Sequence, residues 1–228
     1  MFTIDTQKYN LDMRSLNEKY PPRDTAAYRR LLEAAENCFG TLGSQKTTVV
    51  EIAFVAQVSK PLVYCSFGSK EHLYEVVISR LVGGWNEELV AELSSGAPVA
   101  EALRRMHRVS LDYARTRPLL RGLLAQESRL LLAAYSDIVE RTNATLKTQI
   151  QACLATGVAS GEVRLDVPAG AMADAVTEMH LAYVERIVSG LETRAAERVA
   201  LDAFECLLFG ICMSTDASRA GSQRRKRS

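Results

Sequence analysis

Apolar residues recur at intervals of three and four along almost the whole chain, and this spacing limits the possible folds more than any other feature. Such intervals place side chains on one face of an α-helix. The first face follows Asp24 and comprises Tyr28, Leu31, Leu32, Ala35 and Phe39. No segment alternates apolar and polar residues as a strand would, and no internal repeat is visible. The sequence therefore predicts an all-α fold.

Capping residues and breakers divide this pattern into successive helices. Thr48, Ser59 and Ser69 each precede a helical segment and can cap it, Gly40 and Gly43 close the first helix, and Pro118 interrupts a later one. The expected helices cover residues 24–39, 49–56, 60–65, 69–85, 99–117, 118–134, 138–157 (or to 161), 167–190 and 192–213. Three short helices with a tight turn between the second and third predict a helix-turn-helix unit.

The net charge of the chain, +1, is too small to identify a nucleic-acid-binding protein by itself. The segment from Ser214 onward has five basic residues against Asp216, so the rest of the chain carries −3. We expect residues 214–228 to form a disordered basic tail, which either contacts phosphates or stays solvated. Residues 1–22, which end in Pro21-Pro22, are expected to form a loosely packed N-terminal arm.

Cysteine usage and the N-terminus indicate a reduced, cytoplasmic protein. The five cysteines lie far apart with no CxxC pattern or Cys/His cluster, so we expect free thiols and no metal or cofactor site. The N-terminus lacks the basic-then-apolar pattern of a signal peptide, and no apolar run is long enough for a membrane span.

The segment VSKPLVYCSFGSKEHLY, residues 58–74, indicates what the short helices do. Because Pro61 has no N–H, Ser59 must cap the helix through Leu62. Val63 and Phe67 are four apart and should face inward. The opposite side then presents Pro61, Leu62 and Cys65, flanked by Lys60 and Tyr64. Such a surface suits a DNA major groove, where apolar groups meet thymine methyls, lysine reaches guanine and tyrosine reaches phosphate.

The segment TVVEIAFVAQVSKPLVYCSFGSKEHLY resembles the DNA-binding domain of the TetR (tetracycline-repressor) family of bacterial regulators. The resemblance covers residues 27–80, about a quarter of the chain. The matching elements are Thr48, Ile52-Ala53, Ala56-Gln57-Val58-Ser59, Val63-Tyr64, Phe67, Ser69-Lys70 and Leu73. It implies a helix-turn-helix DNA-binding domain at 23–68, followed by a helical ligand-binding and dimerisation domain at 69–213.

The resemblance also implies which residues contact DNA. Thr47 or Thr48, Tyr64 and Lys70 occupy positions that hold phosphates, and Lys60, Pro61 and Leu62 occupy positions that meet base edges. Ser59 caps the expected helix at residues 60–65, which enters the major groove and is called the reading helix below. Two positions depart from the family pattern: Gln57 replaces a turn glycine, and Ser66 replaces an aromatic residue or histidine that often contacts phosphate.

The last two expected helices are each apolar on two faces. In the final helix, Phe204, Leu207, Leu208 and Ile211 lie beside a second stripe formed by Val199, Ala203, Cys206 and Gly210. A helix with two apolar faces needs two partners. Either both faces are buried in the core of one chain, or the helix pair packs against its copy in a homodimer as a four-helix bundle.

Members of the resembled family are usually repressors released from a palindromic operator in double-stranded DNA by a small-molecule inducer. On the inner stripes of the C-terminal helices, the candidate ligand-binding residues are Met106, His107, Tyr113, Met179, His180 and Tyr183. For each of these residues, the spacing favours plain core packing over contact with a ligand. No residue identifies the inducer.

Four other interpretations remain open at this stage. An enzyme is disfavoured because the three histidines are scattered and no nucleophile or metal-ligand spacing occurs. An architectural or partner-recruiting DNA-binding protein that senses no ligand would have the same helix-turn-helix, and so would an activator. Cys65 on the reading helix is either a small apolar contact or a redox-sensitive thiol.

Overall fold

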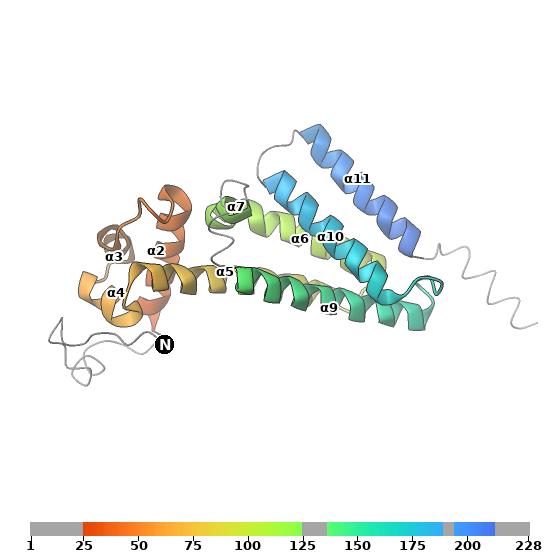
Figure 1. The fold of residues 1–228 in the computed structure, drawn as a ribbon, viewed down its shortest axis with the longest axis horizontal. Coiled ribbons are helices and arrows are strands. Elements are labelled where there is room, and N and C mark those ends of the chain that lie inside the picture. The colour runs from red at the N-terminus through yellow and green to blue at the C-terminus, as the bar shows by residue number, and fades with distance from the viewer. Residues whose placement is uncertain (1–24, 125–135, 189–193, 213–228) are drawn as a thin grey trace, which may run out of the picture. The chain divides into compact units, whose positions relative to one another are not determined.

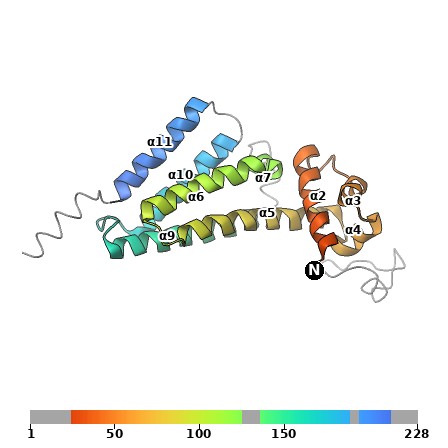
Figure 2. The same ribbon diagram turned by 180° about the vertical axis from the view of Figure 1, so that it is seen from behind.

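The computed structural model describes residues 25–124, 136–188 and 194–212, and within them it is built from α-helices (Figures 1 and 2). The helices are α2 (Ala26–Leu42), α3 (Val49–Ala56), α4 (Lys60–Phe67), α5 (Lys70–Leu93), α6 (Val99–Thr116), α7 (Pro118–Leu124), α9 (Ser136–Ser160), α10 (Ala169–Val188) and α11 (Arg194–Ile211). The described part contains one isolated β-bridge, between Val163 and Cys212, and no strand. The predicted all-α fold is confirmed. The expected arm, the basic tail and residues 125–134 lie outside the described residues.

The chain divides into two compact units, one ending at Leu81 and one beginning at Val82. This division falls inside α5, so the first half of that helix belongs to the helix-turn-helix unit. The sequence places the domain boundary earlier, at residue 69, where α5 begins. The difference arises because the first three turns of α5 supply Leu73, Tyr74 and Val77 to the core of the first unit.

Local capping sets the limits of α2. The Thr25 hydroxyl accepts a hydrogen bond from the amide of Tyr28 at 3.3 Å, which satisfies one free N–H of the first turn. The helix continues through Gly40 to Leu42 and is followed by the C-cap Gly43, whose φ of 79° is readily adopted by glycine. The Gly43 amide donates to the carbonyl of Phe39 at 3.0 Å.

A tight turn joins α3 to α4. Thr48 and Glu51 form a reciprocal capping box at the start of α3. The turn passes through Gln57, which adopts the left-handed conformation with φ 54° and ψ 46°. The two helices are bent by 108°, within the range typical of helix-turn-helix units.

Two aromatic pairs join α2 to α5 and to α4. Phe39 of α2 contacts Tyr74 of α5 edge to face, with ring centroids 4.8 Å apart. Tyr28 stacks on Phe67 of α4 at 5.2 Å. Val63 and Phe67 are buried, as their spacing predicts, and so is Ile52. The orientation of α4 is thus fixed by its inner face, which determines the residues on its outer face.

In the second unit, α10 packs against α9, α6 and α11 (Figures 1 and 2). The core between these helices contains Leu103, Ile150, Val176, Phe204 and Leu208, all fully buried or nearly so. Val184 is also buried. In the first predicted stripe of α11, Phe204, Leu208 and Ile211 are buried and Leu207 is half-buried, so this stripe faces the core.

The second predicted stripe of α11 does not lie in the core of this chain. Val199 is 67% exposed, and Cys206 and Gly210 are exposed as well. Phe209, next to Gly210, is 79% exposed. For α11, the interpretation in which both apolar faces are buried within one chain is therefore wrong.

Among the described helices, none alone is long and apolar enough to cross a membrane. The bent pair α3 and α4 would be long and apolar enough only if the two helices are taken together.

Candidate DNA-binding surface and ligand pocket

The outer face of α4 presents the side chains expected to read DNA. Ser59 accepts a hydrogen bond from the amide of Leu62 at 3.4 Å, so the predicted cap is confirmed. Lys60, Pro61 and Tyr64 are exposed, and the Lys60 ammonium lies 5.8 Å from the centroid of the Tyr64 ring. This is the geometry of a cation–π pair, which brings the lysine and the phenol together on one surface.

Two of the expected DNA contacts need correction. Leu62 is only 9% exposed, because it turns toward the core beside Val63 rather than outward. Thr47 is 1% exposed, and its hydroxyl donates to the carbonyls of Cys38 and Gly43 at 3.0 and 2.8 Å. Neither side chain is available to DNA in this conformation. The hydroxyl of Thr47 instead holds the turn between α2 and α3.

Other predicted contacts have structural partners as well. The exposed Thr48 hydroxyl lies 2.8 Å from the Glu51 carboxylate within the capping box. Lys70 Nζ donates to the carbonyls of Ser44 and Thr47 at 2.9 and 3.2 Å. A lysine ammonium has three protons, so one remains for a phosphate. Ser66 is half-buried.

Cys65 is half-buried on α4, and burial raises the pKa of its thiol. A raised pKa lowers the fraction of thiolate, which is the reactive form. This environment favours the apolar contact over the redox-sensitive thiol.

In the second unit, the structure brings together two of the six predicted ligand-binding residues, His107 and His180. Their Nδ1 atoms are 2.8 Å apart. Nε2 of His180 lies 3.2 Å from the Ser110 hydroxyl. The oxygen of this hydroxyl accepts a hydrogen bond from Trp85 Nε1 at 3.1 Å. Burial lowers the pKa of His107 to about 4, and burial together with the neighbouring His107 lowers that of His180 to about 3. Both rings are therefore neutral at neutral pH.

His107 also borders a pocket of about 220 Å³ between α6 and α11. Its ring stacks on Phe204 with centroids 4.3 Å apart. The remaining lining residues are Arg104, Arg108, Leu111, Asp112, Arg115, Leu201 and Glu205. Among the described residues, no three His, Cys, Asp or Glu side chains form a group that could hold a metal ion.

The other predicted ligand residues do not border this pocket. Met106 is fully buried in the core. Tyr113 is nearly buried and lies under Arg117, whose guanidinium is 4.2 Å from the ring centroid. Met179, Tyr183 and His180 are also absent from its lining.

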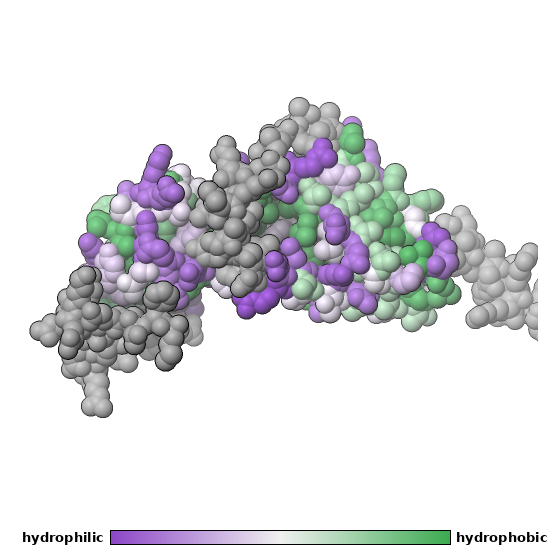
Figure 3. Space-filling model, viewed as in Figure 1, coloured by the Kyte–Doolittle hydropathy of each residue, from purple (hydrophilic) through white to green (hydrophobic). Residues whose placement is uncertain are grey.

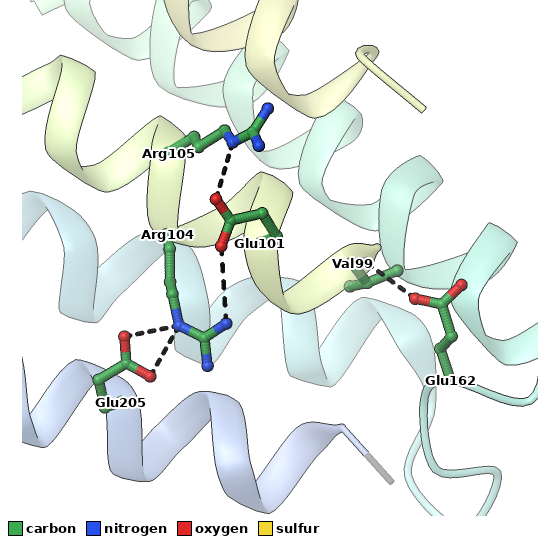
Figure 4. A network of polar contacts seen from close by, with 6 residues as sticks. All are labelled: Val99, Glu101, Arg104, Arg105, Glu162 and Glu205. Carbon is green, nitrogen blue, oxygen red and sulfur yellow. Dashed lines mark hydrogen bonds and ion pairs between the residues drawn. The ribbon is translucent and has the colours of Figure 1, made fainter. Parts of the chain in front are cut away.

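Sequence reasoning did not find the arginines of the pocket. Arg104, Arg108 and Arg115 are separated by four and seven residues, which places them along one face of α6. Figure 4 shows that Arg104 is held by Glu101 of its own helix and by Glu205 of α11, with Nε 2.7 and 2.9 Å from the two Glu205 oxygens. The spacing of the arginines was visible in the sequence, but their partner on α11 lies 101 residues away.

Figure 4 also shows how the first turn of α6 is capped. Pro98 precedes the helix and offers no side-chain cap, so the Glu162 carboxylate accepts the amide hydrogen of Val99 at 2.9 Å. This contact holds the N-terminus of α6, the helix that carries the pocket arginines.

Comparison with known proteins agrees with the helix-turn-helix geometry. Residues 31–77 match the family described as bacterial regulatory proteins, tetR family. The chain is 22% identical over 134 residues to the HTH-type transcriptional regulator YhgD of Bacillus subtilis (strain 168), and the match covers 59% of this chain and 70% of YhgD. It is 30% identical over 142 residues to the HTH-type transcriptional regulator RutR of Escherichia coli (strain K12), covering 61% of this chain and 65% of RutR.

The fold is shared with solved structures as well. The transcriptional regulator FadR from Bacillus subtilis, solved in complex with stearoyl-CoA, superimposes with a TM-score of 0.65 at 17% identity. The match covers 81% of this chain and 99% of FadR. The chain thus spans about two thirds of the length of the two regulators matched by sequence and nearly all of this structural relative.

Proposed function

Because this chain belongs to the TetR family of bacterial transcriptional regulators, we propose that it is a homodimeric repressor that leaves its operator when a small molecule binds the second unit. The chain is a helix-turn-helix DNA-binding regulator rather than an enzyme. Its repression, its inducer, its dimeric state and its cytoplasmic location are the parts that we propose.

The observation that carries the DNA-binding proposal is the outer face of α4. Lys60, Pro61 and Tyr64 are exposed together on a helix whose other face is packed into the core. We assign Lys60 and Pro61 to base edges in the major groove, and Tyr64, Ser66, Thr48 and Lys70 to the phosphates beside it. Ser59 positions the helix through its cap.

The dimer proposal is supported by the uncovered face of α10 and α11. Figure 3 shows apolar side chains gathered over these helices on one side of the second unit. Val199 and Phe209 of α11 are exposed, and so are the small residues Ala171, Ala175 and Ala182 of α10. Small residues allow helices to approach closely, so this pair suits a four-helix bundle formed with a second copy.

A dimer explains how a ligand would release DNA. Two reading helices must enter successive major grooves about 34 Å apart on a palindrome. A ligand that favours a different spacing needs a coupling free energy of only about 1–3 kcal/mol to change affinity roughly 5- to 150-fold. α5 runs without interruption from Lys70 to Leu93 and contributes to both units, so it is the element that we expect to transmit this change.

The first test is a salt-titrated binding assay of the full chain on the DNA that flanks its own gene, followed by footprinting. We expect saturable protection of one or a few short palindromes that persists at moderate salt. Protection of many unrelated positions would instead support the architectural DNA-binding protein. Reporter expression in the presence and absence of the protein separates a repressor from an activator.

A further inference from the structure

The buried histidine pair and the pocket beside it allow the class of the ligand to be inferred, on the premise that the proposed ligand-responsive function holds. His107 is 2% exposed, and its Nε2 atom has no hydrogen-bond partner in the part of the chain that the structure describes. An unpaired buried polar nitrogen destabilises the folded protein unless something binds it. Because His107 borders the pocket, a bound molecule is a natural source of that partner.

The hydrogen bonds behind His107 determine whether this nitrogen donates or accepts. The Ser110 hydroxyl accepts the Trp85 N–H, and its own hydrogen has one acceptor among the described residues, Nε2 of His180. His180 is neutral, so if Nε2 accepts, its proton must be on Nδ1. That Nδ1–H then donates to Nδ1 of His107 across 2.8 Å.

Because Nδ1 of His107 accepts this hydrogen bond, the single ring N–H proton of neutral His107 must lie on Nε2. The reverse arrangement would leave the buried Ser110 hydroxyl hydrogen without an acceptor, since its described contacts are Trp85 and His180. Burial holds the pKa of both rings below neutrality, so neither carries a second proton at neutral pH. The unsatisfied nitrogen is therefore a hydrogen-bond donor, and it calls for an oxygen acceptor.

Charge on the pocket wall selects among such acceptors. The lining contains three arginines and two carboxylates, so one positive charge is in surplus. Arg104 is engaged by Glu205 at 2.7 Å, and Arg115 lies 3.9 Å from Asp112. Arg108 has no ion-pair partner among the described residues. An anionic oxygen suits both the free guanidinium and the His107 donor.

The size and apolar part of the pocket limit the rest of the ligand. Phe204 lies flat against His107, and Leu111 and Leu201 add apolar surface. The volume is about 220 Å³, whereas a cavity of about 150 Å³ accepts benzene. A single aromatic ring with a carboxylate therefore fits.

We propose that the pocket between α6 and α11 binds a small aromatic carboxylate. Its carboxylate accepts a hydrogen bond from His107 Nε2 and pairs with Arg108, and its ring packs on Phe204. Ser110 is a positioning residue, because its hydroxyl sets the direction of the hydrogen bonds in both histidines. Trp85 of α5 lies at the other end of this network, so a ligand in the pocket should alter the surroundings of Trp85 on the helix that both units share.

Trp85 is the single tryptophan of the chain, so its fluorescence provides the assay. The full-length protein, without DNA, is titrated with benzoate and with its neutral counterpart benzamide. We expect saturable benzoate binding with a change in Trp85 emission, and at least tenfold weaker binding of benzamide. Arg108→Gln should weaken benzoate binding at least tenfold. Arg105→Gln is the control, because it removes an equal charge one turn away. Arg105 pairs with Glu101 and does not line the pocket, so this variant should change benzoate affinity less than twofold.

Ser110→Ala tests the direction of the network. It should reduce the ratio of benzoate to benzamide affinity, because nothing then requires Nε2 of His107 to donate. Equal binding of the two compounds, an unaffected Arg108→Gln variant, or no saturable benzoate binding up to about 10 mM would each overturn the proposal. If benzoate binds but does not release operator DNA, the pocket binds aromatic carboxylates but is not the inducer site. If the protein recognises no operator at all, the proposed function is refuted and the binding site is not.

Discussion

Gln57 holds the turn between α3 and α4 in a conformation that suits glycine. It is the one non-glycine residue with positive φ in the described part of the chain. The left-handed conformation costs a residue with a Cβ about 1 kcal/mol. Glycine would remove that cost, although it also makes the unfolded chain more flexible, by about 0.5 kcal/mol.

We therefore predict that Gln57→Gly stabilises the protein by about 0.5 kcal/mol. Gln57→Val should destabilise it, because a β-branched side chain tolerates positive φ least. Chemical denaturation followed by circular dichroism measures both. If the valine variant were as stable as the glycine variant, Gln57 would not occupy this conformation in solution.

The buried rings of His107 and His180 make stability depend on pH. Their pKa values are lowered to about 4 and about 3, so the unfolded chain, with histidine pKa near 6.5, binds more protons between those values. Their contribution to stability is therefore complete above pH 6.5 and is lost as the pH falls toward 4. Each ring contributes up to about 1.4 kcal/mol per pH unit in that window.

Two measurements check this prediction. Thermal unfolding between pH 7.5 and 4.5 should show a falling midpoint, and the carbon-bound proton resonances of both rings should stay constant from pH 8 to pH 5. Titration of either ring near pH 6.5 would contradict the buried, neutral pair.

The adjacent threonines at the start of α3 show the limit of residue assignments made from sequence. Either Thr47 or Thr48 suits a phosphate contact by type and position. The fold decides between them, because the Thr47 hydroxyl turns inward to the carbonyls of Cys38 and Gly43. Those acceptors lie on α2 and the following turn, so the pairing depends on how α2 and α3 pack and cannot be predicted from the local pattern.

At the scale of elements, α4 is the helix whose outer face should carry sequence recognition. We predict that Lys60→Ala leaves the fold intact and weakens operator binding by about 10- to 100-fold, since a lysine contact to a base edge is worth about 1–3 kcal/mol. Tyr64→Ala should weaken binding too. Because Lys60 and Tyr64 form a cation–π pair, the double variant should lose less than the sum of the two.

Fluorescence anisotropy on the footprinted operator measures these affinities. Lys147→Ala, on α9, removes the same charge from the second unit, outside the helix-turn-helix unit, and serves as the control. Unchanged operator affinity in both α4 variants would mean that another surface reads the DNA.

Lys70 at the start of α5 should act on both stability and binding. Its ammonium donates to the carbonyls of Ser44 and Thr47, so Lys70→Ala should destabilise the protein by about 1–2 kcal/mol. If its third proton meets a phosphate, the variant should also bind all DNA sequences more weakly and reduce the slope of log K against log salt by about one.

Lys46→Ala is the matched control for Lys70. Lys46 is exposed in the turn between α2 and α3 whose carbonyls Lys70 binds, and it has no hydrogen-bond or ion-pair partner among the described residues. It should leave stability unchanged. A Lys70→Ala variant with lower stability and an unchanged salt slope would restrict this residue to a structural role.

Local sequence patterns predict the helices of this chain better than they predict its binding sites. Capping residues and periodic apolar spacing predicted α3 and the start of α4, and the inward turn of Val63 and Phe67. The same periodicity placed Leu62 outward, and this was wrong because α4 is short and contacts both α2 and α3. The pocket depends on α6 meeting α11, a contact that local spacing does not encode.

At the scale of the whole molecule, the uncovered face of α10 and α11 should be the dimer interface. Phe209 and Val199 are 79% and 67% exposed on α11, and substituting either with arginine would place a charge in the centre of an apolar interface. We predict that Phe209→Arg and Val199→Arg shift the protein to monomers in sedimentation velocity and lower its affinity for a palindromic operator. Leu165→Arg provides the control, because Leu165 is 80% exposed but lies in the loop before α10. Because a monomer keeps one reading helix, it should retain weak binding to half-sites. Dimers that persist in both α11 variants would place the interface elsewhere on the chain.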